Sequence, residues 1–158
     1  MSLLRKASIV TTPTSYENGK ILSVKPSVVL GNELITNGDF STDSDWNKGT
    51  GWSIGDGKAI KTVGNSAFLS QNANIVVGKN YKATFTISNV TNGSLNLMAD
   101  FSTSVQSFTS DGDYIVYYQS NSASLVFLSN STFNGSIDNV SVKEAIDADF
   151  DFTRNSSA

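Results

Sequence analysis

The stretch that decides the fold is residues 81–101, YKATFTISNVTNGSLNLMADF. In residues 81–87 every second side chain is apolar and those between are polar or small, a period of two that predicts a half-buried β-strand. Asn92 and Gly93 form a dipeptide typical of tight hairpin turns. Residues 95–101 alternate again, with Phe101 on their apolar face. The sequence therefore predicts an antiparallel hairpin with one buried face.

Short segments of the same kind recur at even spacing along the chain. ASLVFL is apolar on both faces, so we expect it to be a central, covered strand. About nine short strands without a helical pattern indicate an all-β chain, and a β-sandwich of the jelly-roll type is the expected fold. The further candidate strands are ELIT (33–36), GWSI (51–54), KAIKTV (58–63), AFLSQ (67–71), NIVV (74–77), YIVYYQ (114–119), ASLVFL (123–128) and SIDNVSV (136–142).

Composition narrows the class of protein. The 158 residues fit one domain plus an appendage, since domains typically hold roughly 100–150 residues. Charged residues make up 16% of the chain, below the usual ~25%, and the net charge is −3. Nucleic-acid binding needs a concentrated basic face, so we expect no nucleic-acid partner. No apolar run approaches the roughly 20 residues that span a bilayer, so we expect no membrane insertion.

The chain has no cysteine and no histidine. It therefore has no disulfide or thiolate chemistry, and it lacks the commonest general base and the commonest transition-metal ligand. A pair of carboxylates can act as acid and base in glycoside hydrolysis, but no separate signal for a cleft accompanies the aspartates. We expect a protein that is not an enzyme.

Residues 1–32 differ from the rest of the chain. They hold both prolines and only short apolar pieces, with Asn18-Gly19 as a turn signal between two extended pieces. We interpret them as an extended N-terminal arm that lies on an external surface; the alternative is a first strand or two packed on the domain itself. The arm residues expected to attach to a partner are Leu3, Leu4, Arg5, Ile9, Val10, Ile21 and Leu22.

The rest of the chain divides into two further parts. Residues 33–145 form the predicted jelly roll. Residues 146–158 are acidic and then polar, and we expect a linker or the start of a further segment.

Aromatic side chains are the first candidates for a binding surface. Trp46 lies in a polar, Gly-rich stretch, where it could stack on a sugar or plug the end of the core. Tyr117 and Tyr118 fall on opposite faces of their predicted strand, so one of them must point away from the core. All three are candidate carbohydrate contacts.

Acidic side chains crowd the loop after ELIT, and Asp138 precedes the last strand. Carboxylate oxygens in loops can bind calcium, although Asp and Asn also bend and cap loops without any metal. The spacing of an EF-hand loop is absent. Asp39 and Asp138 are the candidate ligands of a structural calcium, and no other cofactor is expected.

Residues 33–144 resemble the carbohydrate-binding modules appended to bacterial xylanases and cellulases. The resemblance rests on LITNGDFS (34–41), a Trp soon followed by Gly-Trp, GKNYKATFTIS (78–88) and SIDNVSVKE (136–144). It implies a jelly roll. The family's structural calcium would use an acid just after the Asn-Gly-x-Phe element, where this chain has Ser41, and the Asp of the closing Ile-Asp-Asn-Val, which is Asp138.

The two ends of the chain resemble a different class. SLLRKASIVTTPTSYENGKILSVKP (2–26) resembles the N-termini of tailed-bacteriophage virion proteins, and DFDFTRNSSA (149–158) is similar to a segment that recurs in phage tail and fibre proteins. This resemblance implies a structural protein on the surface of the virion. Its arm would attach to the capsid or the tail, and the jelly roll would serve in decoration or host adhesion, in several copies or as a homo-oligomer.

The leading interpretation is this virion structural protein, whose displayed domain contacts host-surface glycans. The alternative is a non-catalytic carbohydrate-binding module that recognises bacterial-surface or environmental polysaccharide. An enzyme has the least support, because no residue pattern points to a catalytic group.

Overall fold

The structure, a computed structural model, describes residues 12–17, 20–24 and 28–146. Within these residues the chain forms β-strands and no helix, so it has no helix that could cross a membrane. The strands are β1 (Thr12–Glu17), β2 (Lys20–Val24), β3 (Val29–Glu33), β4 (Asn47–Lys48), β5 (Trp52–Gly55), β6 (Lys58–Lys61), β7 (Ala67–Asn72), β8 (Asn80–Asn92), β9 (Leu95–Met98), β10 (Ser104–Phe108), β11 (Gly112–Gln119), β12 (Ser124–Ser129) and β13 (Asn134–Ile146).

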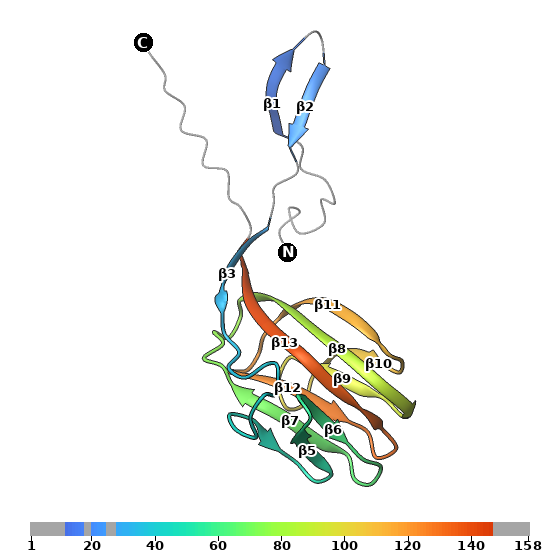
Figure 1. The fold of residues 1–158 in the computed structure, drawn as a ribbon. Helices are drawn as coiled ribbons and strands as arrows, with labels where there is room; N and C mark the ends of the chain where they lie inside the picture. The colour runs from blue at the N-terminus through green and yellow to red at the C-terminus, as the bar shows by residue number, and fades with distance from the viewer. Residues whose placement is uncertain (1–11, 18–19, 25–27, 147–158) are drawn as a thin grey trace. The chain divides into compact units, whose positions relative to one another are not determined.

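Two antiparallel sheets pack face to face (Figure 1). One has five strands in the order β10-β9-β12-β7-β4, and the other has six, in the order β11-β8-β13-β6-β5 with β3 paired to β13. The central strand β12 is covered on both faces, since Val126 and Phe127 are both fully buried. The fold is thus a β-sandwich of the jelly-roll type, which confirms the expected fold class.

The chain divides into two compact units. Leu30–Ala145 forms the sandwich, which therefore begins slightly before Glu33 and includes most of β3. In the other unit, β1 and β2 pair as an antiparallel hairpin with Glu17 opposite Lys20. The expected turn at 18–19 lies outside the described residues. Of the predicted attachment residues, Ile21 and Leu22 are in β2, and Leu3, Leu4, Arg5, Ile9 and Val10 lie outside the described residues.

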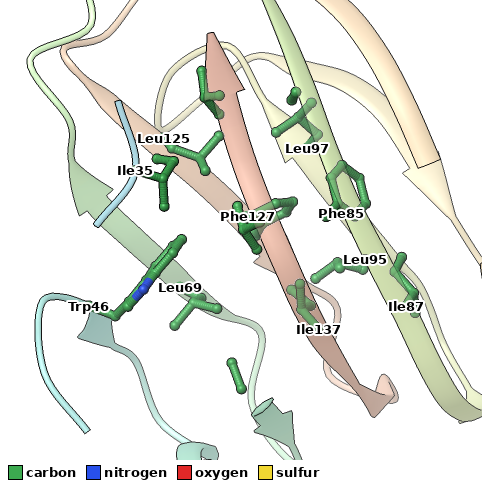
Figure 2. Packing of buried hydrophobic residues seen from close by; sticks show 14 of the residues in the cluster. Ile35, Trp46, Leu69, Phe85, Ile87, Leu95, Leu97, Leu125, Phe127 and Ile137 are labelled. Carbon is green, nitrogen blue, oxygen red and sulfur yellow. The ribbon is translucent and has the colours of Figure 1, made fainter. Parts of the chain in front are cut away.

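The core of the sandwich centres on Phe85 of β8. Its ring centroid lies 5.0 Å from that of Phe127 on β12 and 5.1 Å from that of Phe108 on β10, both edge-on. Because β8 belongs to one sheet and β10 and β12 to the other, these contacts join the two layers. Figure 2 shows aliphatic side chains of both sheets around Phe85 and Phe127. Burial of each such side chain contributes about 1.5–3 kcal/mol.

The loop that follows β3 is fixed to the last strand. The backbone N–H of Val140 donates to the carbonyl oxygen of Gly38 at 2.8 Å. Phe40, two residues further on, is buried with its ring 5.0 Å from that of Trp46. A Cβ atom at Gly38 would lie 2.0 Å from the carbonyl oxygen of Val140, so only glycine fits this close approach of two backbones.

Three expectations about strands are wrong. Of ELIT, only Glu33 belongs to a strand, and residues 74–77 form none although Ile75 is buried. Phe101 lies beyond the end of β9, in an exposed loop. In the first two segments the backbone makes single hydrogen bonds to distant residues without forming a ladder: the N–H of Ile75 donates to the carbonyl of Ala123, and that of Leu34 to the carbonyl of Val142. The missed strand β10 is mostly polar and exposed, so hydrophobic alternation could not reveal it.

The close packing at Gly38 predicts a large loss of stability for Gly38→Ala. We expect a decrease of about 2 kcal/mol or more in the free energy of unfolding, because a backbone must move to admit the methyl group. Gly55→Ala is the matched control, since no atom lies within 4 Å of a Cβ there. It should change stability by no more than about 0.5 kcal/mol. Urea denaturation measures both, and equal losses in the two variants would refute the steric argument.

Candidate functional site

The outer face of the six-stranded sheet carries the candidate site. On β8 the side chains at 81, 83, 85 and 87 are buried, so those at 82, 84 and 86 point to the opposite face. The registers with β11 and β13 extend each of these positions into a row across three strands. The rows are Tyr117–Lys82–Lys143, Ile115–Thr84–Ser141 and Asp113–Thr86–Asp138.

Tyr117 and Ile115 form the apolar part of this face. They lie two residues apart on β11, and 57% of Tyr117 and 62% of Ile115 is exposed. Side chains at i and i+2 share one face of a strand, so the two make one continuous apolar surface. Their neighbours across the strand pair are Lys82 and Thr84. An exposed aromatic ring therefore lies beside hydrogen-bonding groups.

Polar side chains on this face are held by one another. The Thr86 hydroxyl donates to Asp113 Oδ1 at 2.7 Å, across the pair formed by β8 and β11. The hydroxyls of Ser88 and Ser136 lie 2.9 Å apart across the pair formed by β8 and β13. Such cross-strand bonds fix the rotamers of short side chains, so the polar groups on this face are preorganised.

A shallow hollow lies on the same face and includes the two lysines of the row that contains Tyr117. It is lined by Leu30, Lys82, Thr84, Ser141 and Lys143. Leu30 comes from β3, which pairs with β13 and forms one edge of the hollow. The hollow is thus lined by two lysines, two hydroxyl-bearing residues and one apolar residue.

Glu33 borders the hollow through its bond with Ser141. Its carboxylate accepts hydrogen bonds from the Ser141 hydroxyl and from the backbone N–H groups of Ile35, Val142 and Leu34, the last three at 2.9–3.1 Å. Burial raises the pKa of Glu33, but these four donors outweigh it, so the pKa lies below the ordinary glutamate value. These four hydrogen bonds stabilise the charged form of Glu33. Two of them come from Ser141 and Val142, so they join the start of the sandwich to β13.

Two of the three predicted carbohydrate contacts are buried. Trp46 is 6% exposed, and its indole N–H donates to the carbonyl of Asn37 at 3.0 Å. Tyr118 is also 6% exposed, burial raises its pKa, and its hydroxyl has no hydrogen-bond partner within the described part of the chain. Neither ring presents a face to solvent, so both are corrected to core residues. Tyr117 stays a candidate contact.

The candidate calcium ligands lie near one another in the fold but do not form an acidic cluster. Asp39 follows Gly38, whose carbonyl binds Val140, two residues after Asp138. Each carboxylate accepts a local backbone N–H, that of Ser41 for Asp39 and that of Asn139 for Asp138. No three Asp, Glu, His or Cys side chains of the described residues gather at a point, whereas calcium takes six to eight oxygen ligands. These side chains do not fit a calcium site on their own, and calcium stays an untested prediction.

The other sheet has an apolar outer surface that the sequence did not reveal. Phe101, 52% exposed, packs edge-on against Phe68 of β7, with ring centroids 5.3 Å apart. The loop that carries Phe101 is organised by Asp100. Hydrogen bonds from the hydroxyl and N–H of Ser102, and from Thr103, lower the pKa of Asp100 to about 2. This surface lacks the rows of lysine and threonine beside Tyr117.

Comparison with known proteins gives a likeness of fold. No protein-family model matches the chain, and neither does any curated protein. Among solved structures, the chain is similar to BiXyn10A CBM1 (16% identity, 70% of this chain and 94% of that one, TM-score 0.49) and to the mannan-binding module from Man5C (13%, 65% and 92%, 0.44). The enzymatically active domain of tailspike protein 4 of bacteriophage CBA120 also matches (16%, 71% and 21%, 0.44), and the chain spans about a fifth of its length.

The local bonds of Glu33 predict a pH-dependent contribution to stability. Because the folded state lowers this pKa, the stabilisation is present above the unfolded value of about 4.3 and is lost as pH falls through the folded value. Allowing for partial exposure of the carboxylate, Glu33→Gln should lower the free energy of unfolding by about 1 kcal/mol at pH 7.

Urea denaturation from pH 7 to pH 3 tests this linkage. The difference between the parent and Glu33→Gln should shrink below about pH 4. Asp56→Asn removes an exposed carboxylate elsewhere on the sandwich and serves as the control. A difference for Glu33→Gln that stays constant over the whole range would contradict the assignment.

Proposed function

We propose that the Leu30–Ala145 sandwich is a non-catalytic carbohydrate-binding module that recognises polysaccharide on the outer face of β11, β8 and β13. The observation that carries this proposal is the exposed ring of Tyr117 beside rows of hydroxyl and amino groups. Sugar rings have apolar faces that pack on aromatic rings, and hydroxyl groups at their edges that pair with Ser, Thr and Lys.

The surrounding geometry supports this assignment. Thr86 and Asp113 are held by their mutual bond, and Thr84 lies between Ile115 and Ser141 in the middle row. Preorganised groups lose little conformational entropy on binding, which suits recognition by few contacts. Weak binding per module gains strength when several copies meet one polymer.

Paired aromatic variants test the site. Tyr117→Ala should weaken binding to the polysaccharides found on a glycan array by about tenfold, the loss expected for one stacking contact. Phe101→Ala is the matched control, because it removes a ring of similar exposure from a loop that packs on the other sheet and should leave affinity unchanged. Affinity electrophoresis measures both variants. Silence across bacterial-surface and plant polysaccharides, or a loss only in Phe101→Ala, would refute the proposal.

A second proposal concerns how the module is displayed. We infer that the chain is a phage virion structural protein held on the capsid or tail through its N-terminal segment, in several copies, so that the module faces host-surface glycans. The observation in favour is the β1–β2 hairpin, whose strands pair only with each other among the described residues. An isolated two-stranded hairpin is marginally stable in water, and pairing with the sheet edge of a partner would stabilise it.

A truncation tests the attachment. Removing residues 1–27 leaves all of β3 in place, so the sandwich should keep its thermal midpoint. Removing the whole predicted arm, residues 1–32, would delete most of β3. Immunogold labelling should then detect the full-length protein on phage particles and fail to detect the truncated one. Truncated protein that appears on particles at the full-length level would exclude attachment through this segment.

A further inference from the structure

The outer face of the six-stranded sheet contains an unfavourable pair of charges. Lys82 of β8 and Lys143 of β13 lie directly opposite each other in the antiparallel register. Directly opposed side chains have Cβ atoms about 4.5–5.5 Å apart, and like charges in such positions destabilise a sheet. Both lysines are half-buried, and the ion pairs among residues 28–146 use Lys48 and Lys79 instead. Among residues 28–146 neither lysine takes part in an ion pair, and the carboxylate that borders the hollow, that of Glu33, bonds to Ser141 and to backbone N–H groups instead.

The hollow between these lysines is suited to an anionic group. Thr84 and Ser141 line it together with the two lysines, and the Ser141 hydroxyl donates its proton in a hydrogen bond to Glu33. The nearby carboxylate of Glu33 accepts four hydrogen bonds, three from backbone N–H groups and one from Ser141, which fix its position; it stays charged, so the two lysines together must outweigh it to hold an anion. An anion placed between the lysines would turn their repulsion into two charge-assisted contacts. Local rules of sheet pairing are often broken where a ligand supplies the compensation.

We propose that this hollow binds the carboxylate of an acidic sugar in the polysaccharide, while Tyr117 packs on a sugar ring beside it. Tyr117 is the cross-strand partner of Lys82, so the ring and the hollow occupy adjacent positions along the row Tyr117–Lys82–Lys143. The inference rests on the proposed function and narrows its ligand to polymers that carry uronic acids. A neutral polysaccharide would leave both lysines unpaired and bind more weakly.

The test compares ligands that differ only in charge. Isothermal titration of the full chain uses oligomers of polygalacturonate and the same oligomers with every carboxylate methyl-esterified. We expect the acidic form to bind at least about tenfold more tightly, with an affinity that falls as salt rises. Dextran sulfate should bind more weakly than polygalacturonate. Equal affinity for the acidic and esterified oligomers, or stronger binding of dextran sulfate, would overturn the assignment.

Variants connect this preference to the two lysines. The double variant Lys82→Gln/Lys143→Gln should lose the tenfold preference for the acidic oligomer. Its thermal midpoint should stay the same or rise, because the repulsion is removed. Lys48→Gln removes a positive charge that pairs with Asp43 outside the hollow, so this control should keep the preference. A double variant at 82 and 143 that still prefers the acidic form would also overturn the inference.

The outcomes separate this inference from the proposed function. If neutral polysaccharides bind in a Tyr117-dependent way and acidic ones gain nothing, the carbohydrate-binding face stands and the uronate site is wrong. If the acidic preference depends on Lys82 and Lys143 while Tyr117→Ala changes no affinity, the anion site stands and the stacking role in the proposed function is wrong.

Discussion

The contact of Phe85 with Phe127 and Phe108 is the constraint on which the rest of the sandwich depends. The contact places the Phe85 side chain of β8 between the two sheets. Because successive side chains of a strand point to opposite faces, the residues on either side of Phe85 must point outward. A register slip of one residue would bury Lys82 and expose Phe85, so the core strongly disfavours it. The arrangement of the outer face therefore follows from the packing of the inner one. The buried rings of Phe85, Phe108 and Phe127 therefore determine which side chains of β8 lie in the rows of the candidate site.

Much of this fold is readable from alternation alone. Residues 81–87 give the buried and exposed faces of β8 correctly, and the doubly apolar β12 is central in its sheet. The orientation of β11 is not readable in this way, because Tyr117 and Tyr118 are chemically alike and both faces of the strand are apolar. Only the packing partner decides, and Tyr118 lies 6.2 Å from the buried ring of Tyr81.

The candidate site was harder to predict for a physical reason. The pairing of Lys82 with Lys143 joins residues far apart in sequence, and it depends on a register shift in β13 between Asp138 and Ser141. Such a bulge leaves no clear signal in hydrophobicity, yet it determines which residues meet. Trp46 shows the opposite difficulty. Its polar, acidic surroundings in the sequence suggest exposure, but its ring is covered by Phe40 once the loop folds onto β13.

The pairing of β3 with β13 has a consequence for how this sandwich can be combined with other segments. The chain enters the sandwich on one strand and leaves it on the neighbour, with Gly31 directly against Glu144. A domain whose entry and exit points adjoin can be inserted into another protein, exchanged or duplicated while the flanking segments keep their separation. The strand β3 thus has two roles: it forms one edge of the hollow, and it brings the chain into the sandwich beside the strand by which the chain leaves.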